Sequence, residues 1–265
     1  MSVLTLETIG ALMLAGLAWA GDVSLFGLRA LREALRPPFE TRELIRQVYE
    51  VGSRSVPLIA VAGFAVGVVM SMHSRSSLER FGAQALIPTV LALSMAREIG
   101  PLVTGLLVSG RVGAGIGAEL GGMRVTEQID ALESLAVDSF KYLVVTRVVA
   151  CMLAQPILTT LMSFMGIVGG YVAETVISGI SFRLYFDRAF SSMEFVDYIP
   201  ATIKTTVFGF IIGTVSSYLG YNTKGGAEGV GRASTLSVVL TSIFLIVTNV
   251  VLVKIIVFLF PQGAG

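Results

Sequence analysis

Charged residues are scarce in this sequence. Asp, Glu, Lys and Arg make up 14% of the 265 residues, while hydrophobic residues make up 54%. Soluble domains carry about 25% charged residues, so this composition argues against a soluble globular protein. Several apolar stretches approach the roughly 20 residues that an α-helix needs to cross a bilayer. We therefore expect an all-α polytopic membrane protein. The net charge is +1 and there is no basic aromatic patch, so we expect no nucleic-acid partner.

Cysteine and histidine occur once each, as Cys151 and His73. A lone cysteine excludes a disulfide within the chain and a cysteine-based metal site. The sequence signatures of zinc hydrolases and of serine nucleophiles are absent as well. Residues 226–234 have the glycine spacing of a phosphate-binding loop, but Arg232 and Ala233 replace the required Lys and Ser/Thr. We therefore expect no enzymatic activity, no metal ion and no cofactor in this chain.

Five apolar stretches predict about five transmembrane helices, at residues 56–72, 83 to beyond 108, 142–172, 199–219 and 236–260. Asp22 interrupts the apolar residues 9–28, and the leucines that follow recur at helical spacing with arginines on the other faces. This pattern is typical of an amphipathic helix in the membrane interface, and a sixth span is the alternative. The expected organisation is an N-terminal interfacial (elbow) region at residues 1–54 and a transmembrane domain at residues 55–265.

A cluster of arginines precedes the first predicted span and indicates a cytoplasmic N-terminus. In this orientation the segment around Arg124 is cytoplasmic, and the loops that carry Arg75 and Arg183 face outside. Five spans leave the C-terminus outside. The clustered arginines are Arg29, Arg32, Arg36, Arg42, Arg46 and Arg54.

Five charged residues fall within or near the predicted spans, and two of them, Arg147 and Lys254, lie near span ends. The other three are Arg97, Glu98 and Lys204. A charge at membrane depth costs about 2.5–3.5 kcal/mol on insertion scales, so such residues usually serve a function. Neighbouring side chains on a helix point about 100° apart, so Arg97 and Glu98 are not expected to pair with each other. We expect Lys204 to pair with Glu98, which leaves Arg97 available for an anionic group such as a lipid phosphate. A purely structural ion pair between two helices is the alternative. Arg147 lies near the end of a span, where a long side chain can reach the interface.

Residues 124–136, in the cytoplasmic loop between the second and third spans, combine an apolar face with acidic faces. This pattern predicts a short amphipathic helix that docks into a groove of a partner protein. The alternative is a surface helix resting on lipid, but an acidic helix is poorly suited to an anionic leaflet. The apolar residues are Val125, Ile129, Leu132 and Leu135, and the acidic residues are Glu127, Asp130 and Glu133.

Glycines recur at four-residue spacing in several spans. Such pairs let helix backbones approach closely in a bilayer, and we expect most of them to serve packing within the chain. Pro101 weakens the hydrogen-bond ladder of the second span and predicts a kink or hinge just after Glu98. The glycine pairs are Gly63/Gly67, Gly113/Gly117, Gly117/Gly121, Gly166/Gly170 and Gly209/Gly213.

The sequence AREIGPL at residues 96–102, followed by SGRVGAGIGAELG at residues 109–121, strongly resembles the MlaE/YrbE permease family. The resemblance continues through residues 123–136 and covers the chain from about residue 36 to the last span. These permeases belong to ATP-binding-cassette (ABC) lipid transporters that are associated with MCE proteins.

The resemblance implies a homodimeric, non-catalytic permease subunit in the bacterial inner membrane. It also implies a separate cytoplasmic ATPase that holds ATP and Mg²⁺, a hexameric periplasmic MCE protein, and a STAS-domain protein that can bind the ATPase. The implied cargo is phospholipid, moved between the inner and outer membranes to maintain outer-membrane lipid asymmetry. The ATPase would dock on the helix between the second and third spans, here at Arg124, Glu127, Ile129, Asp130, Leu132 and Glu133.

In such a transporter, Arg97, Glu98 and Lys204 are expected to line or support a lipid cavity at the dimer interface. A self-contained secondary transporter or channel that uses the same three residues is the alternative. That alternative needs no ATPase, and it leaves the acidic cytoplasmic helix unexplained. A membrane enzyme is a third hypothesis, disfavoured because the chain lacks a nucleophile or a metal-ligand set.

Overall fold

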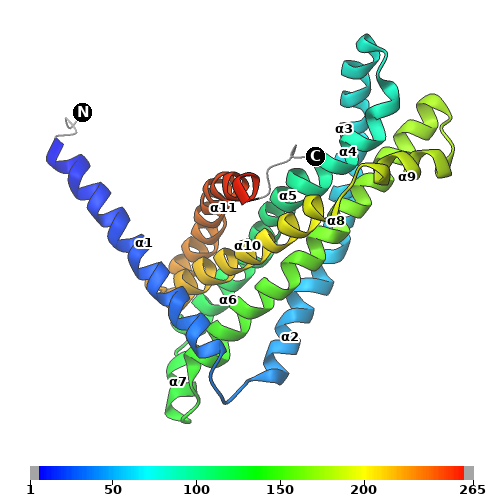
Figure 1. The fold of residues 1–265 in the computed structure, drawn as a ribbon. Helices are drawn as coiled ribbons and strands as arrows, with labels where there is room; N and C mark the ends of the chain where they lie inside the picture. The colour runs from blue at the N-terminus through cyan, green and yellow to red at the C-terminus, as the bar shows by residue number, and fades with distance from the viewer. Residues whose placement is uncertain (1–5, 260–265) are drawn as a thin grey trace.

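The structure is a computed structural model that describes residues 6–259, and every regular element in that range is helical. The expectation of an all-α protein is confirmed. Figure 1 shows an elongated bundle with α7 at one end and α9 at the other. The helices are α1 (Leu6–Ala34), α2 (Thr41–Gly52), α3 (Val56–Leu78), α4 (Ile87–Ser94), α5 (Gly100–Val108), α6 (Ala114–Val125), α7 (Gln128–Ser134), α8 (Thr146–Ser178), α9 (Phe182–Ser191), α10 (Phe195–Tyr221) and α11 (Gly226–Leu259).

Several of these helices join end to end into longer rods. A π-helical turn at Met95–Ile99 joins α4 to α5, and a second at Ser109–Gly113 joins α5 to α6. Single π-helical turns are rare and often occur at functional sites. The rods are Thr41–Phe81 (α2 and α3), Gln84–Val125 (α4 to α6) and Phe140–Ser178 (α8 with the π-helical segment before it).

Six helices in the described range are long and apolar enough to cross a membrane. Five of them are the predicted spans, which confirms the multi-pass architecture, and the sixth is the Met13–Ala34 part of α1. Asp22 interrupts the apolar sequence pattern, as expected, but its side chain lies on the exposed face of α1, which runs through this position as one helix. The count of five spans is therefore approximate, and the placement of α1 in the interface stays a prediction.

The central helix of the bundle is α8, which contacts α2, α3 and α10. Glycines bring its neighbours into direct backbone contact. A Cβ atom on Gly67 of α3 would lie 1.8 Å from the carbonyl oxygen of Gly166, and one on Gly209 of α10 would lie 2.3 Å from that of Cys151. These glycines serve packing within the chain, as predicted. Cys151 is 1% exposed, at the seam between α8 and α10.

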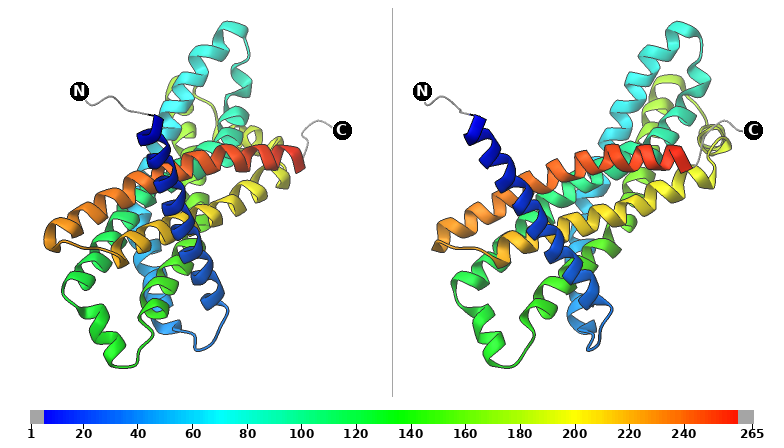
Figure 2. Two further views of the ribbon diagram at one scale, coloured as in Figure 1. Left: turned by 90° about the vertical axis from the view of Figure 1, so that its left-hand side faces the viewer. Right: turned by 60° about the vertical axis from the view of Figure 1, so that its left-hand side comes forward.

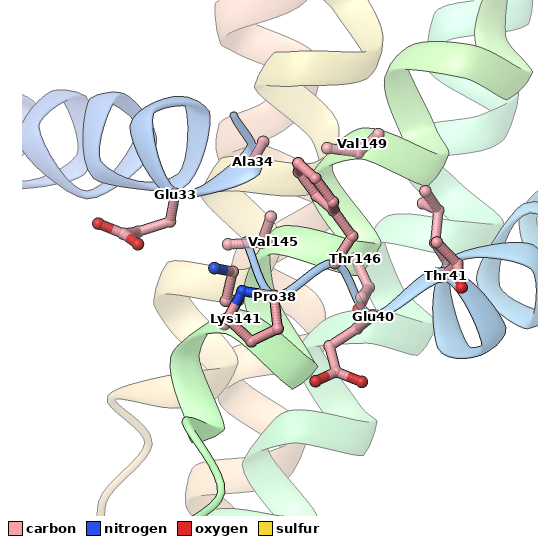
Figure 3. Close-up of a pocket in the computed structure, with 11 residues that line it drawn as sticks. Glu33, Ala34, Pro38, Glu40, Thr41, Lys141, Val145, Thr146 and Val149 are labelled. Atoms are coloured by element: carbon pink, nitrogen blue, oxygen red, sulfur yellow. The ribbon is translucent and has the colours of Figure 1, made fainter. Parts of the chain in front are cut away.

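The remaining long helices flank this centre. Figure 2 shows α11 running beside α10, and the two helices are in contact. The N-terminal part of α1 projects from the bundle, whereas Phe26 in its C-terminal half packs on Phe140, with ring centroids 5.0 Å apart. A cavity of about 70 Å³ lies where α1, α2 and α8 meet (Figure 3). Beside it, Lys141 Nζ donates to the Arg36 carbonyl at 2.6 Å, which ties the linker between α1 and α2 to the bundle.

Candidate functional site

The irregular turn in the second span positions its two charged residues. Pro101 follows the π-helical turn Met95–Ile99, and proline has no N–H. The carbonyl of Arg97, four residues earlier, therefore lacks its usual helical donor. Lys204 Nζ of α10 donates to that carbonyl oxygen at 2.9 Å. Pro101 thus follows a π-helical turn and leaves the Arg97 carbonyl as a backbone acceptor for a neighbouring helix, while a kink or hinge at Pro101 stays a prediction.

Glu98 and Lys204 form the ion pair that the sequence predicts. Lys204 Nζ lies 2.9 Å from Glu98 Oε2; the Lys204 side chain is 2% exposed and that of Glu98 is 44% exposed. Asn249 Nδ2 of α11 also donates to Glu98 Oε2, at 3.4 Å. The Glu98 carboxylate thus links its own helix to α10 and α11, and a buried ammonium group depends on it.

Arg97 pairs with Asp197, which corrects the expectation that it stays available for an anion. Arg97 Nη2 lies 2.5 Å from Asp197 Oδ1. Asp197 forms a capping box with Glu194 in the first turn of α10, which begins at Phe195, before the start of the apolar stretch. Sequence reasoning misses Asp197 because it assigns this turn to the outer loop. The usable signal is spacing: Asp197 and Lys204 are two helical turns apart and so share one face of α10.

These four residues, which we call the intramembrane charge cluster (Arg97, Glu98, Asp197 and Lys204), carry balanced charge. Pairing is necessary because an isolated ion buried at this depth would cost several kcal/mol. The two α10 members are buried, whereas the side chain of Arg97 is 35% exposed, comparable to that of Glu98. The side chains of Arg97 and Glu98 therefore each remain partly exposed, so a polar group from outside the chain can approach them.

Two further ion pairs were not expected from the sequence. Arg147 is buried on α8, with Nη2 2.9 Å from Glu119 Oε1 of α6, so the prediction that it reaches the interface is wrong. Glu119 holds the guanidinium inside the bundle. Towards the other end of the bundle, Arg75 pairs with Glu174, and Ser71 donates to Glu174 Oε1 at 2.8 Å. This pair joins α3 to α8.

The predicted docking helix corresponds to α7, which is shorter than residues 124–136. Glu127, with a φ of 58°, forms the turn between α6 and α7. Glu127 and Asp130 are exposed, and Arg124 Nη1 lies 2.7 Å from Asp130 Oδ1. The acidic surface that the sequence predicts is present at this end of the bundle.

The apolar face of α7 packs mainly on its own chain. Ile129 is fully buried and Leu132 packs against the same core, so these two residues support the helix from inside rather than facing a partner. Leu135 is exposed. An open groove of about 360 Å³ lies beside α7, with Glu119, Leu132 and Arg147 among its lining residues. The surface available to a partner thus consists of acidic side chains and this groove.

Comparison with known proteins places these features in a family context. The sequence model of the family described as Permease MlaE matches residues 44–255, which include the intramembrane charge cluster and α7. A probable ABC transporter permease protein of Rickettsia bellii (strain RML369-C) is 42% identical over 229 residues, covering 86% of this chain and 88% of that protein. A probable ABC transporter permease protein of Synechocystis sp. is 36% identical over 208 residues, or 78% and 79% of the two chains. The chloroplastic protein TRIGALACTOSYLDIACYLGLYCEROL 1 of Arabidopsis thaliana is 33% identical over 248 residues, or 93% of this chain and 70% of that protein.

Proposed function

This chain belongs to the MlaE permease family, and from that premise we propose that it moves phospholipids between the inner and outer membranes of a bacterium. It is the non-catalytic, multi-pass permease subunit of an ABC transporter, so ATP hydrolysis takes place on a separate subunit. Family membership sets aside the alternative of a self-contained secondary transporter or channel. The proposed transport maintains the lipid asymmetry of the outer membrane.

The intramembrane charge cluster is the observation that carries the lipid assignment. A zwitterionic phospholipid headgroup has an anionic phosphate and an ammonium group. The partly exposed Glu98 offers a carboxylate for the ammonium group, and Arg97, which is paired with Asp197 but still 35% exposed, adds a positive charge toward which the phosphate is attracted. The relative from Arabidopsis thaliana carries the name of a glycerolipid, which agrees with a lipid cargo.

We propose that two copies of this chain enclose the lipid cavity at their interface. Supporting this, α11 exposes a broad apolar surface that includes Ile246, Val250 and Val251, and its Asn249 contacts Glu98. The proposed location is the bacterial inner membrane, with a hexameric periplasmic MCE protein on the outer face.

The proposed docking site of the ATPase is α7. Its exposed Glu127 and Asp130, with Arg124 beside them, face away from the bundle. ATP and Mg²⁺ would be held by the ATPase, to which a STAS-domain protein can bind in turn. The permease would supply only the docking surface and the lipid path.

The test is purification of the tagged protein from native membranes in mild detergent, with mass spectrometry of bound proteins and lipids. We expect an ABC ATPase, an MCE protein and phospholipid to co-purify, and ATP hydrolysis to depend on the permease. A lone oligomer without an ATPase would contradict the docking role. An assembled complex without phospholipid would contradict the proposed cargo.

A further inference from the structure

Two hydroxyl groups and one carboxylate lie within hydrogen-bond distance of one another where α7 meets the rest of the bundle. Ser139 Oγ donates to Glu133 Oε1 at 2.6 Å, and the Tyr221 hydroxyl lies 2.8 Å from Ser139 Oγ and 3.3 Å from Glu133 Oε1. The Ser139 hydroxyl uses its proton to donate to Glu133. The Tyr221 hydroxyl therefore donates, with Ser139 Oγ and Glu133 Oε1 as its acceptors. Hydrogen bonds to a charged acceptor are about twice as strong as neutral ones. We call these three residues the α7 latch (Glu133, Ser139 and Tyr221).

The α7 latch joins three separate elements. Glu133 belongs to α7, Ser139 directly precedes the long helix Phe140–Ser178, and Tyr221 is the last residue of α10. Ser139 is buried. The Tyr221 ring packs edge-on against Phe140, with centroids 6.3 Å apart, which fixes the position of its hydroxyl. The Asp130 side chain is bonded to Arg124 of the preceding helix, whereas Glu133 Oε1 is bonded to the residue before the long helix Phe140–Ser178 and to the end of α10.

From the α7 latch, α10 leads directly to the intramembrane charge cluster. It is one helix of 27 residues, or about 40 Å, with Tyr221 at one end and Asp197 and Lys204 towards the other. At Gly209 and Gly213 it touches the backbone of α8, so α10 cannot slide along α8 without a clash. By contrast, its polar contacts with the Met95–Ile99 turn include two ion pairs. A displacement at Tyr221 would therefore carry α8 along with α10 and shift α10 against the Met95–Ile99 turn, where these ion pairs lie.

We propose that Glu133, Ser139 and Tyr221 are positioning residues that transmit the movement of α7 to α10 and so to the lipid-binding face of Arg97 and Glu98. This inference rests on the proposed docking of the ATPase at α7, and it assigns a different task to one of the residues expected there. Glu127 and Asp130 hold the ATPase, whereas Glu133 connects the docked helix to the transport path. Without the α7 latch, the ATPase still binds and hydrolyses ATP, but its movement is not passed on.

The experiment uses the full transporter, in which this chain is reconstituted with its own ATPase and MCE protein in phosphatidylethanolamine/phosphatidylglycerol vesicles. Three quantities are measured: ATPase retained in pull-down, ATP hydrolysed, and ATP-dependent transfer of a fluorescent phosphatidylethanolamine. Tyr221→Phe removes one hydroxyl and keeps the ring, and Ser139→Ala removes the second hydroxyl. Tyr218→Phe is the matched control, because Tyr218 lies one turn earlier on α10 and its hydroxyl has no hydrogen-bond partner among residues 6–259.

We expect Tyr221→Phe and Ser139→Ala to retain the ATPase fully and to hydrolyse ATP, while lipid transferred per ATP falls roughly tenfold or more, the effect of losing one hydrogen bond to a charged acceptor. Tyr218→Phe should match the wild type. Glu133→Gln keeps a hydrogen-bond acceptor, so it should retain part of the lipid transfer per ATP. Unchanged lipid transfer per ATP in both hydroxyl variants would overturn the proposal. So would loss of ATPase binding in Glu133→Gln, which would make Glu133 a docking residue. If the wild-type chain itself bound no ATPase or transferred no lipid, the proposed function would fail, and this inference with it.

Discussion

At the scale of single residues, the charge on Glu98 decides whether Lys204 can stay buried. Glu98→Lys would place a second ammonium group beside Lys204. It would also remove the only carboxylate that pairs with Lys204 among the described residues. Removing one partner of a buried pair costs several kcal/mol. We expect phospholipid transfer in proteoliposomes to fall on the order of tenfold or more, because each 1.4 kcal/mol is tenfold in an equilibrium constant. Pull-down should recover the ATPase at wild-type levels.

The charge-swapped protein controls for this prediction. Glu98→Lys combined with Lys204→Glu restores opposite charges across the same two helices, and part of the lost transfer should return. Wild-type transfer in Glu98→Lys alone would remove the ion pair from the mechanism.

Gln155 supports a second residue-scale prediction. It is buried on α8, and neither atom of its amide has a hydrogen-bond partner among the described residues. An unsatisfied buried polar group costs about 1–3 kcal/mol, so Gln155→Leu should raise the melting temperature of the purified protein. The control is Gln47→Leu, which removes a buried hydrogen bond of 2.7 Å to Glu43 and should lower it. A lower melting temperature for Gln155→Leu would mean that the amide has a partner, such as a bound water.

Residue pairing was predictable from the sequence only where both partners fall clearly inside spans. Glu98 and Lys204 meet this condition, and their pairing was correctly predicted. Asp197 precedes its apolar stretch, and hydropathy does not register the extra helical turn that a capping box adds. Ile129 illustrates a different limit: an apolar helical face must be covered, but its periodicity does not identify whether the same chain or a partner covers it.

At the scale of helices, the seam between α3 and α8 has no room for a side chain. Gly67→Ala would place a methyl group against the Gly166 carbonyl, so the two helices must move apart. Overpacking of this kind costs about 1–3 kcal/mol. We expect a clear fall in melting temperature and in the yield of folded protein. The control, Gly115→Ala, has nothing within 4 Å of the new methyl group and should leave stability equal or slightly higher. Equal stability of the two variants would contradict direct backbone contact at this seam.

The second helix-scale prediction concerns α7. Reversing the charges of the exposed Glu127, in the turn before α7, and Asp130, within it, by Glu127→Lys and Asp130→Lys should weaken ATPase binding, because the proposed docking surface is acidic. The measurement is ATPase recovered in pull-down at two salt concentrations, and the loss should be the same or larger at low salt. Glu228→Lys changes one exposed acidic residue at the start of α11 and should leave recovery unchanged. Full recovery with the double reversal would refute docking at α7.

The helices themselves were largely predictable, because a bilayer requires long apolar segments whose backbone bonds are satisfied internally. The details that shape the site were not. The residues of the π-helical turn Met95–Ile99 would also suit a regular α-helical turn, so the sequence does not indicate the wider hydrogen-bond pattern. Asp22 lowers the local hydropathy without breaking α1, so the sequence left open whether this helix lies in the interface or forms a sixth span.

At the scale of the whole molecule, two kinds of helix contact divide the bundle. The glycine contacts join α3, α8 and α10 by backbone, whereas the charge cluster holds α10 to the second span by ion pairs. Composition predicts the number and approximate position of the helices, but their three-dimensional neighbours follow from which small residues face one another. The central position of α8 was therefore not predictable from one sequence.

The burial of Cys151 has a practical consequence for measuring orientation. A maleimide in water cannot reach the Cys151 thiol. Any labelling of a variant with one introduced cysteine therefore comes from the introduced cysteine alone. With an impermeant maleimide on intact spheroplasts, Asp187→Cys on α9 should react, whereas Ala131→Cys on α7 should react only after permeabilisation; both positions are exposed. Ala11→Cys, near the start of α1, should stay unmodified from outside if α1 lies in the interface, and modification there would make α1 a sixth span. The native protein thus already serves as the cysteine-silent parent from which such a topology map is usually engineered.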